Sequence, residues 1–484
     1  MFTIRPDHRS TRRSFLKVGA LGLGGLGLPS FLQGNPIADR PWVRDKSVVW
    51  VWLGGGPPQQ ETWDPKPNIP SEFRTMFGEI QTSLPGVTFG SHFPRLAERA
   101  HRLAIVRSFQ TPCRDHQENW VRAMLTGEDR RPSPPSVGSL YAHLRGTNHP
   151  TTGMPSYVLL DSGNNREFLQ EHFLRGNTTG DLPDAYAPFN PGGVLTSSRP
   201  ATAAAERAPQ RRQEQDITFS PLLQAMEMRL PADRWANRLE LLRQFDTMAR
   251  ELEGDPIIAA HDEFQAQANR VLNGSVAEAF RLDREDQRIV DRYDTSHITL
   301  TCPNFRGLPD FPQRPSLLGR QMLLARRLCE AGAGLVMVEN CGWDFHGTNL
   351  DPDQRRGLEG FGPSLDWAIS AFLDDVQQRG LEDRILLVVC GEMGRTPRIN
   401  ANGGRDHWPT LAPLLIAGGG FRMGQVIGRS DAQGGRPTTT PITHTDLIST
   451  ILRSLVDPTQ LRLFPNIRPD HLRRIEEGRP IPGL

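Results

Sequence analysis

Short apolar runs recur along the chain and are separated by segments with helical periodicity. The clearest run, SVVWVWL at 47–53, is almost continuously apolar and ends at Gly-Gly-Gly-Pro-Pro, as expected for a strand buried on both faces of a parallel sheet. Five similar runs are also predicted strands: 103–106, 157–160, 335–338, 385–390 and 414–417. Helices are predicted at 117–125, 137–144, 317–331, 365–379 and 445–455.

This alternation predicts the α/β fold class, with a doubly wound, mostly parallel central sheet and helices on both faces. The segment from about 161 to 310 departs from the pattern, because it is polar, rich in Arg, Gln and Glu, and largely helical from 235 to 294. We interpret it as a helical, loop-rich insertion. The predicted organisation is a terminal segment at 1–40 followed by one domain at 41–484.

The first 33 residues have the pattern of an export signal. Arg12 and Arg13 precede Ser-Phe-Leu-Lys and an uncharged stretch at 18–33, which is too short and too rich in glycine to span a membrane stably. This matches the twin-arginine pattern and predicts a periplasmic or extracellular protein whose partner is the twin-arginine export machinery. A basic, apolar terminal helix is the alternative. No clear small-x-small cleavage site follows, so an uncleaved anchor stays open, but no later run is long enough to predict a transmembrane segment in the mature chain.

Charge and cysteine content exclude several classes of function. Lys plus Arg total 56 and Asp plus Glu total 55, so the net charge of +1 does not favour nucleic acid as a partner. The five cysteines form no CxxC pair, which excludes a thiolate zinc site and a dense disulfide framework. Function must therefore be sought in local motifs.

Polar side chains collect directly after the predicted strands, where open parallel sheets bind their ligands. Carboxylates and imidazoles that arrive from several strand ends are the ligands that a divalent metal such as zinc, manganese or calcium needs. The candidate metal ligands are Glu61, Asp64, Asp344, His346, Glu392, Asp406 and His407, and His116 follows the second strand. Their joint occurrence at successive strand ends favours one site.

Each of these residues also has a purely structural interpretation. A loop Asp that caps a helix would account for Asp344, and an ion pair with Arg395 would account for Glu392. Asp406 would lie in a Gly-rich turn. If the site does bind a metal, Asp344 or Asp406 could orient an imidazole rather than bind the ion, and the sequence does not separate these roles.

Several longer stretches resemble a known bacterial family. The stretches that carry the resemblance are GGGPPQQETWDPKP, RQMLLARRLCEAGAGLVMVENCGWDFHGTNL, GEMGRTPRINANGGRDHWP, THTDLISTIL and GRPIPGL. Together with the twin-arginine start, they resemble the domain-of-unknown-function family 1501 over roughly residues 40–484. That family is similar to the alkaline phosphatase and sulfatase superfamily, which implies an alkaline phosphatase-like sheet with metal ligands at its strand ends.

The resemblance also implies roles for individual residues. By position, Glu61 or Asp64 corresponds to the acid after the first strand, and Asp344 and His346 to later ligands. Glu392 falls at the acid of an Asp-His pair, and His407 at the last ligand His. The nucleophile is expected near the helix after the second strand, where Ser108 and Thr111 are candidates with His116 close by. Apart from the resemblance, we expect Arg395 or Arg405 to hold the anionic group of the substrate through a bidentate contact.

Two departures from the superfamily pattern narrow the expected function. Met393 follows Glu392 where members that bind two metals have a His, so one metal site is expected to be incomplete. No Cys-x-Pro-x-Arg or Ser-x-Pro-x-Arg run is present, so a formylglycine sulfatase is not expected. The leading hypothesis is an exported, metal-dependent hydrolase of phosphate or sulfate esters, acting on a small-molecule or glycan ester. The alternative is a non-catalytic exported binding protein that keeps the same fold.

Overall fold

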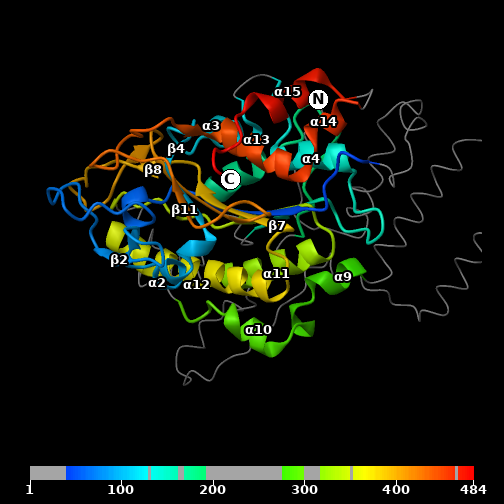
Figure 1. Cartoon of the computed structure of the whole chain (residues 1–484). Helices are drawn as coiled ribbons and strands as arrows, with labels where there is room; N and C mark the ends of the chain where they lie inside the picture. Colours follow the sequence, from blue (N-terminus) through cyan, green and yellow to red (C-terminus); the bar gives the residue numbers. More distant parts are fainter. Residues whose placement is uncertain are drawn as a thin grey trace, which may run out of the picture.

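An eight-stranded sheet lies at the centre of the molecule (Figure 1). The computed structural model describes residues 40–128, 132–161, 168–191, 275–298, 317–348, 353–463 and 467–484. The strand order is β11-β4-β10-β7-β1-β6-β5, and β12 pairs with β4 beside β11. The strands are β1 (Ser47–Leu53), β4 (Ala104–Gln110), β5 (Tyr157–Leu160), β6 (Leu335–Glu339), β7 (Ile385–Gly391), β10 (Ala412–Gly418), β11 (Gln425–Ile427) and β12 (Ile442–Thr443).

Strand direction brings several chain segments to one edge of the sheet. Neighbouring strands are parallel except at β10, which runs antiparallel to both β4 and β7. The carboxyl ends of β1, β4, β6 and β7 therefore lie at the same edge as the start of β10. The predicted α/β fold with a mostly parallel sheet is confirmed.

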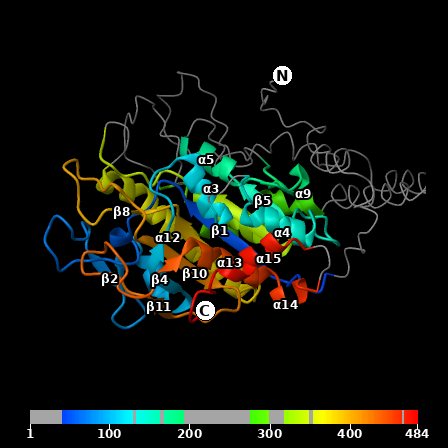
Figure 2. The same cartoon turned by 90° about the horizontal axis from the view of Figure 1, so that it is seen from above.

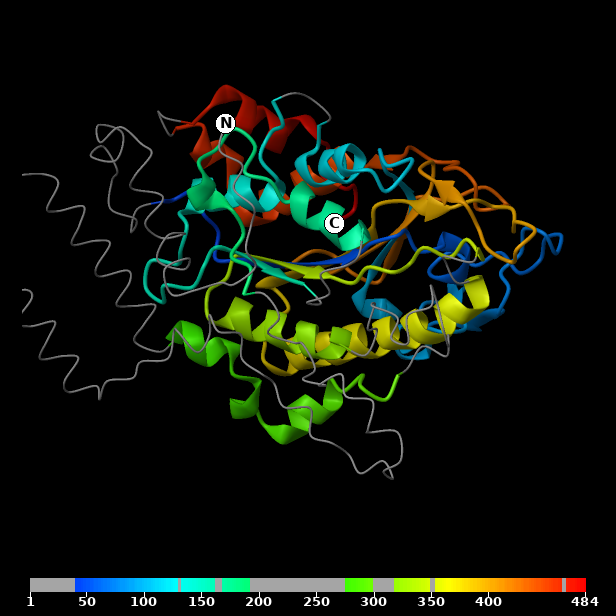
Figure 3. The ribbon, with the colours of Figure 1, turned by 180° about the vertical axis from the view of Figure 1, so that it is seen from behind.

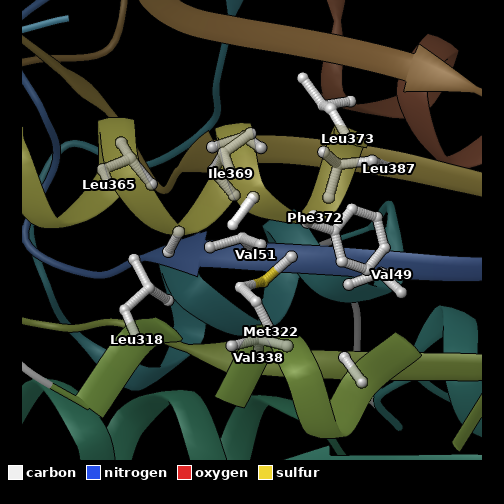
Figure 4. Packing of buried hydrophobic residues seen from close by; sticks show 14 of the residues in the cluster. Val49, Val51, Leu318, Met322, Val338, Leu365, Ile369, Phe372, Leu373 and Leu387 are labelled. Carbon is white, nitrogen blue, oxygen red and sulfur yellow. The ribbon is translucent and has the colours of Figure 1, made fainter. Parts of the chain in front are cut away.

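The central strand β1 shows how the sheet is covered on both faces. Its side chains alternate, so Val49 and Val51 belong to one apolar cluster and Trp50 and Trp52 to the other. Figure 4 shows the first cluster, in which side chains of two long helices pack against β1 and its neighbouring strands. Because both faces are buried, the strand has no solvent-facing positions and reads as a continuous apolar run.

Helices form a layer on each face of the sheet (Figures 1 and 3). The layer beside Val49 contains α2 (Pro94–Glu98), α9 (Ser275–Phe280), α10 (Gln287–Arg292), α11 (Leu318–Glu330) and α12 (Gln354–Gln378). The opposite layer contains α3 (Glu118–Thr126), α4 (Val137–Arg145), α5 (Phe168–Gly176), α13 (His444–Leu455), α14 (Pro458–Leu461) and α15 (Pro469–Glu477). The view from above in Figure 2 shows α3, α4, α13 and α15 on this second face.

Helix α12 begins well before its predicted start at residue 365. Asp353 caps its N-terminus by accepting a hydrogen bond from the backbone of Arg356, and Pro363 lies inside the helix. The glycines that hid this part of the helix serve close packing, because a Cβ at Gly357 would lie 2.2 Å from the ring of Phe345. These glycines look like a break in the helix in the sequence, but in the structure they allow close contact with the loop after β6.

Two small ribbons and several short turns complete the described fold. The ribbons pair β2 (Glu79–Gln81) with β3 (Thr88–Gly90), and β8 (Gly394–Arg395) with β9 (His407–Trp408). The 3-10 turns are η2 (Gln59–Glu61), η3 (Ala100–Arg102), η4 (Asp184–Tyr186) and η5 (Leu282–Arg284). The ribbon of β8 and β9 lies at the edge of the sheet where the parallel strands end (Figures 1 and 2).

Parts of the predicted organisation fall outside the described residues. Arg12 and Arg13 lie there, as does much of the proposed insertion at about 161–310. Among the insertion's described residues, α5 packs beside α3, and α9 packs against α11. The assignment of these residues to an insertion stays a prediction. None of the helices in the described ranges combines the length and apolar character needed to cross a membrane.

Candidate metal centre

Four side chains from three strand ends converge at this edge of the sheet. His116 lies in the loop between β4 and α3, Asp344 and His346 lie in the loop after β6, and His407 begins β9. One ligand atom from each residue lies within 4.8 Å of those from the others. We call this group the His116 cluster. The sequence had placed all four residues among its candidates.

The three imidazoles of the His116 cluster point the same ring nitrogen at one carboxylate oxygen. Asp344 Oδ1 lies 3.2 Å from Nε2 of His116, 2.9 Å from Nε2 of His346 and 3.6 Å from Nε2 of His407. The Nε2 atoms of His346 and His407 are 3.0 Å apart. His116 Nε2 is buried and has no hydrogen-bond partner, because its short distance to Asp344 lacks hydrogen-bond geometry.

Each imidazole has a second carboxylate near its other nitrogen. His116 Nδ1 donates a hydrogen bond to Glu392, and His346 Nδ1 lies 3.1 Å from Asp406 Oδ1. His407 Nδ1 lies 3.9 Å from Asp115 Oδ1, which is an ion-pair distance rather than a hydrogen bond. A carboxylate at Nδ1 holds one proton there, so a ring that gives up its second proton presents the Nε2 lone pair to the cluster.

These partner roles revise two predicted metal ligands. Glu392 and Asp406 contact the Nδ1 atoms of His116 and His346, on the side of each ring that faces away from the cluster. Arg395 pairs with Asp344 and not with Glu392. Glu392 is 1% exposed and also accepts a hydrogen bond from Gly55 N at 3.1 Å. The orienting role that the sequence left open for Asp406 is the one its position supports.

Arg395 is part of the same arrangement but is not free to bind a substrate. It is fully buried, and its Nη2 donates to Asp344 Oδ1 at 2.6 Å. Its Nη1 lies 3.2 Å from His346 Nε2. Its remaining hydrogen bonds go to the backbone carbonyls of Gly55, Gly56, Trp343 and Arg405. The predicted bidentate contact between Arg395 and a substrate anion would require breaking these bonds.

The charges in the cluster shift its ionisation equilibria. Burial would raise the pKa of Asp344, but Arg395 and the three imidazoles hold that pKa well below its usual range. Burial would lower the pKa of His116, but Glu392 and Asp344 raise it to about 9. The pKa of His346 is raised by Asp344 against the effect of burial, whereas burial lowers the pKa of His407. Asp344 is therefore an anion under all ordinary conditions.

Glycines in the adjoining loops let the backbones approach closely. Gly55 has a φ of +104°, and a Cβ there would lie 2.7 Å from the backbone nitrogen of Asp344. A Cβ at Gly404 would lie 2.2 Å from the carbonyl carbon of His346. Larger residues at either place would push the loop after β6 out of position. The glycine-rich motifs thus let the loops that carry the His116 cluster pack closely together.

Two predicted ligands after β1 lie against other partners. Glu61 is buried, accepts hydrogen bonds from Met76 N, and lies 3.3 Å from Arg405 Nη2. Burial raises the pKa of Glu61, and Arg405 opposes that shift. Asp64 pairs with Lys66 at 2.9 Å and accepts a hydrogen bond from a serine hydroxyl. Neither side chain belongs to the His116 cluster, because each is held by an ion pair of its own.

Within the described part of the chain, the side chains of the other predicted catalytic residues, Ser108, Thr111 and Arg405, make no hydrogen bond to the four residues of the cluster. Arg405 is fully buried, and its Nη atoms bond to Glu61 and to backbone carbonyls. These bonds leave the Nη atoms unavailable to the anionic group of a substrate. Ser108 is fully buried, and its Oγ would lie 2.1 Å from a Cβ at Gly428. The hydroxyls of Ser108 and Thr111 have no hydrogen-bond partner among the described residues, so no base is in contact with either.

Asn400 is a site residue that sequence reasoning missed. Its Nδ2 donates to the carbonyl of His346 at 3.0 Å and to Asp406 Oδ1 at 3.1 Å. It therefore ties the loop after β6 to the loop before β9. An Asn beside Gly-Gly in NANGGRDHW is an ordinary turn signal, and this tertiary role leaves no separate trace in the sequence.

The family model described as "Protein of unknown function (DUF1501)" matches residues 45–484. The chain belongs to the DUF1501 family. This confirms the family resemblance seen in the sequence. No curated protein matches this DUF1501 chain.

Solved structures that resemble the DUF1501 chain are distant. The phosphonate monoester hydrolase SpPMH from Silicibacter pomeroyi is 11% identical, with 90% of this chain and 76% of that chain covered and a TM-score of 0.38. The PsFucS1 sulfatase from Pseudoalteromonas sp. is 11% identical, with 85% and 68% covered and a TM-score of 0.38. Alkaline phosphatase from the Antarctic bacterium TAB5 is 9% identical, with 85% and 98% covered and a TM-score of 0.33. Because these similarities are so distant, the chemistry of this chain has to be argued from its own residues.

Proposed function

We propose that this DUF1501 protein is a metal-dependent hydrolase of phosphate or sulfate esters. The observation that carries the proposal is the arrangement around Asp344, where three imidazole Nε2 atoms face one carboxylate and each ring has another carboxylate near its Nδ1. Histidine ligands of catalytic metals have this outer support.

The donor set fits a divalent ion of the zinc class. Three imidazole nitrogens and one carboxylate oxygen are ligands typical of zinc, and manganese accepts the same types, whereas calcium prefers oxygen alone. The buried Nε2 of His116 has no hydrogen-bond partner in the protein, and a bound ion would satisfy it. His116, His346, His407 and Asp344 are the residues that would hold the ion.

Three of the four side chains are partly exposed to solvent, which favours catalysis over a purely structural role. The His116 side chain is only 6% exposed, but those of Asp344, His346 and His407 are 17%, 18% and 21% exposed. Structural zinc sites are closed, whereas catalytic sites keep a position for substrate or water. When bound, the ion would supply Lewis-acid polarisation of the ester and activate an attacking oxygen.

The surrounding residues hold this chemistry in place. Arg395 keeps Asp344 ionised and fixes its orientation through backbone carbonyls. Glu392 and Asp406 keep a proton on Nδ1 of His116 and His346, so that Nε2 is the nitrogen that each ring offers to a metal once its second proton has left. These hydrogen bonds and ion pairs fix the ring orientations from within the protein.

A non-catalytic binding protein is the second candidate function, and a specific observation favours it. Among the described residues, the hydroxyls of Ser108 and Thr111 contact no base, and the Nη atoms of Arg395 and Arg405 bond to protein partners. The groups expected to attack the ester and to hold its anion are therefore not positioned for those tasks. The metal centre could then serve recognition of an anionic small molecule or glycan.

One set of measurements separates the two functions. Purified full-length chain loaded with Zn²⁺ or Mn²⁺ is assayed with p-nitrophenyl phosphate, bis-p-nitrophenyl phosphate and p-nitrophenyl sulfate. The hydrolase proposal expects turnover of at least one ester, which His407→Ala reduces at least 100-fold while the far-UV circular dichroism is unchanged. His101→Ala is the matched control, because His101 contacts Ser83 at the opposite edge of the sheet and should not alter the rate.

Three outcomes are informative. Turnover that falls in His407→Ala but not in His101→Ala supports the hydrolase. Stoichiometric metal without turnover, together with saturable binding of the same esters, supports the binding protein. A folded chain that binds neither Zn²⁺ nor Mn²⁺ overturns both forms of the proposal.

We also propose that the protein is exported by the twin-arginine route to the periplasm or beyond. The support is the order of Arg12, Arg13 and the uncharged stretch at 18–33. The test is localisation of a tagged full-length chain against an Arg12→Lys/Arg13→Lys variant. The variant should accumulate in the cytoplasm, and equal export of the two chains would contradict the proposal.

A further inference from the structure

A second cluster of ligand-type side chains lies in the helical layer, away from the His116 cluster. It consists of Asp181, in the loop between α5 and η4, and Asp470 and His471, at the start of α15. One ligand atom from each residue lies within 4.8 Å of the others. In Figures 1 and 2, α15 is well separated from β8, which marks the His116 cluster. We call this group the His471 cluster.

The imidazole of His471 is fully buried, and neither ring nitrogen has a hydrogen-bond partner in the described part of the chain, which is unusual for a polar side chain. An imidazole always has at least one polar nitrogen to satisfy, and leaving it unpaired in the interior costs free energy. Asp181 Oδ1 is likewise buried without a partner. His471 and Asp181 thus each have a buried ligand-type atom with unused bonding capacity, and one ligand atom of each residue lies within 4.8 Å of the other.

Arg468 pairs with both carboxylates of the His471 cluster. Arg468 Nη2 lies 2.6 Å from Asp181 Oδ2 and 2.8 Å from Asp470 Oδ2, and its side chain is 44% exposed. The guanidinium also donates from Nε to Asp470 Oδ1 at 3.1 Å, so its hydrogen bonds within the described residues go to carboxylates and not to the imidazole of His471. A divalent ion would match the charge of the pair and would also bind the imidazole.

We propose that Asp181, Asp470 and His471 form a second metal site, which takes a divalent ion of the zinc class. Two carboxylates and one imidazole are a ligand set that zinc accepts, with a fourth position for water. The nitrogen ligand argues against calcium or magnesium, which prefer oxygen. Binding displaces Arg468 from the carboxylates into solvent, where its exposed side chain can go.

The position of the His471 cluster gives the ion a structural role. Asp181 belongs to the loop after α5, whereas Asp470 and His471 belong to the C-terminal helix α15. The ring of His471 packs edge-on against His143 of α4, with ring centroids 5.5 Å apart. An ion here would fasten α15 to the layer formed by α4 and α5.

The test removes the His116 cluster first, so that only the second site can hold metal. A His346→Gln/His407→Gln chain is equilibrated with Zn²⁺, and bound zinc is measured by mass spectrometry after dialysis. We expect about one ion per chain, and adding Asp470→Asn or His471→Ala should reduce zinc affinity at least tenfold. Glu476→Gln is the matched control, because Glu476 also lies on α15 in an ion pair with an arginine, Arg462, but outside the cluster.

Arg468→Gln distinguishes a metal site from a cluster that serves only as a salt bridge. If the carboxylates form a metal site, removing the competing guanidinium should tighten zinc binding at least threefold. If they only pair with Arg468, the same substitution in the His346→Gln/His407→Gln chain should leave it without bound zinc. Circular dichroism melts of every variant verify folding. Where the double variant does not fold, zinc stoichiometry is compared instead between the wild-type chain and Asp470→Asn, which should hold two ions and one.

The outcomes distinguish this site from the proposed catalytic centre. A folded His346→Gln/His407→Gln chain that holds no zinc overturns the second site and leaves the hydrolase proposal intact. A double variant that keeps all the zinc of the wild-type chain, and loses it with Asp470→Asn, overturns the catalytic centre and supports the second site. An Asp470→Asn chain with wild-type zinc content overturns the second site.

Discussion

Glu392→Gln tests whether the buried acid behind His116 strengthens metal binding through its charge. Both hydrogen bonds to this side chain, from His116 Nδ1 and from Gly55 N, use the same oxygen, Oε1. A glutamine whose carbonyl oxygen takes that place keeps both bonds and loses only the negative charge. With Glu392 1% exposed, solvent cannot compensate for the loss.

The expected effect follows from the role of such partners. Removing an outer carboxylate from a metal-bound histidine typically weakens metal affinity about 10–100-fold, which corresponds to about 1.4–2.7 kcal/mol. The lower end applies if the imidazole stays in place, as the retained hydrogen bonds suggest. The assay is competition between the metal-free protein and a chromophoric chelator for Zn²⁺ at fixed neutral pH.

Glu61→Gln is the control for this experiment. Glu61 is also 1% exposed, and its contacts go to Met76 and Arg405 rather than to an imidazole. Its variant should bind Zn²⁺ with the affinity of the wild-type chain. Wild-type affinity in Glu392→Gln, or equal weakening in both variants, would refute the assignment of Glu392 as the partner of a metal ligand.

Three further predictions concern packing, ionisation and loop geometry. Leu387→Ala opens a cavity between β7 and the helices on its face and should lower the free energy of unfolding by about 2–5 kcal/mol in urea titrations; a loss under 1 kcal/mol would contradict the packing. Burial raises the pKa of Asp366 to about 7, so the native state keeps a proton that the unfolded chain has released, and stability should fall as the pH rises from about 4 to about 7. Asp366→Asn should flatten that dependence, and parallel pH profiles for the two chains would count against it. Gly404→Ala should weaken zinc binding at least tenfold by displacing the backbone of His346, whereas Gly380→Ala, where no atom lies within 4 Å of the added Cβ, should not; equal affinities would show that the loop adapts.

The sequence predicts elements best where local signals and burial coincide. The run at 47–53 is the whole of β1, because an apolar stretch closed by Gly and Pro has few alternatives. The start of α12 is missed, since glycines used for packing look like a helix break. The reversed direction of β10 has no local signature, because strand direction depends on which distant strand is the neighbour.

The candidate site shows the same division between local and tertiary information. Residue types at strand ends single out His116, Asp344, His346 and His407, which do lie together. Whether an acid faces the cluster, supports a ring or pairs with an arginine is decided by the fold. Glu61 illustrates this, because Arg405, its partner, is separated from it by most of the chain.

The place of β1 in the sheet has a consequence for synthesis of the protein. Val48 pairs with Leu335 on one side and with Leu386 on the other. The first strand of the described chain therefore cannot pair with either neighbour until residues much later in the sequence have been translated. Until then, an apolar strand with two tryptophans is an unpaired template for aggregation. We therefore expect nascent chains stalled before residue 335 to depend on chaperones, and the sheet to close only after most of the chain has left the ribosome.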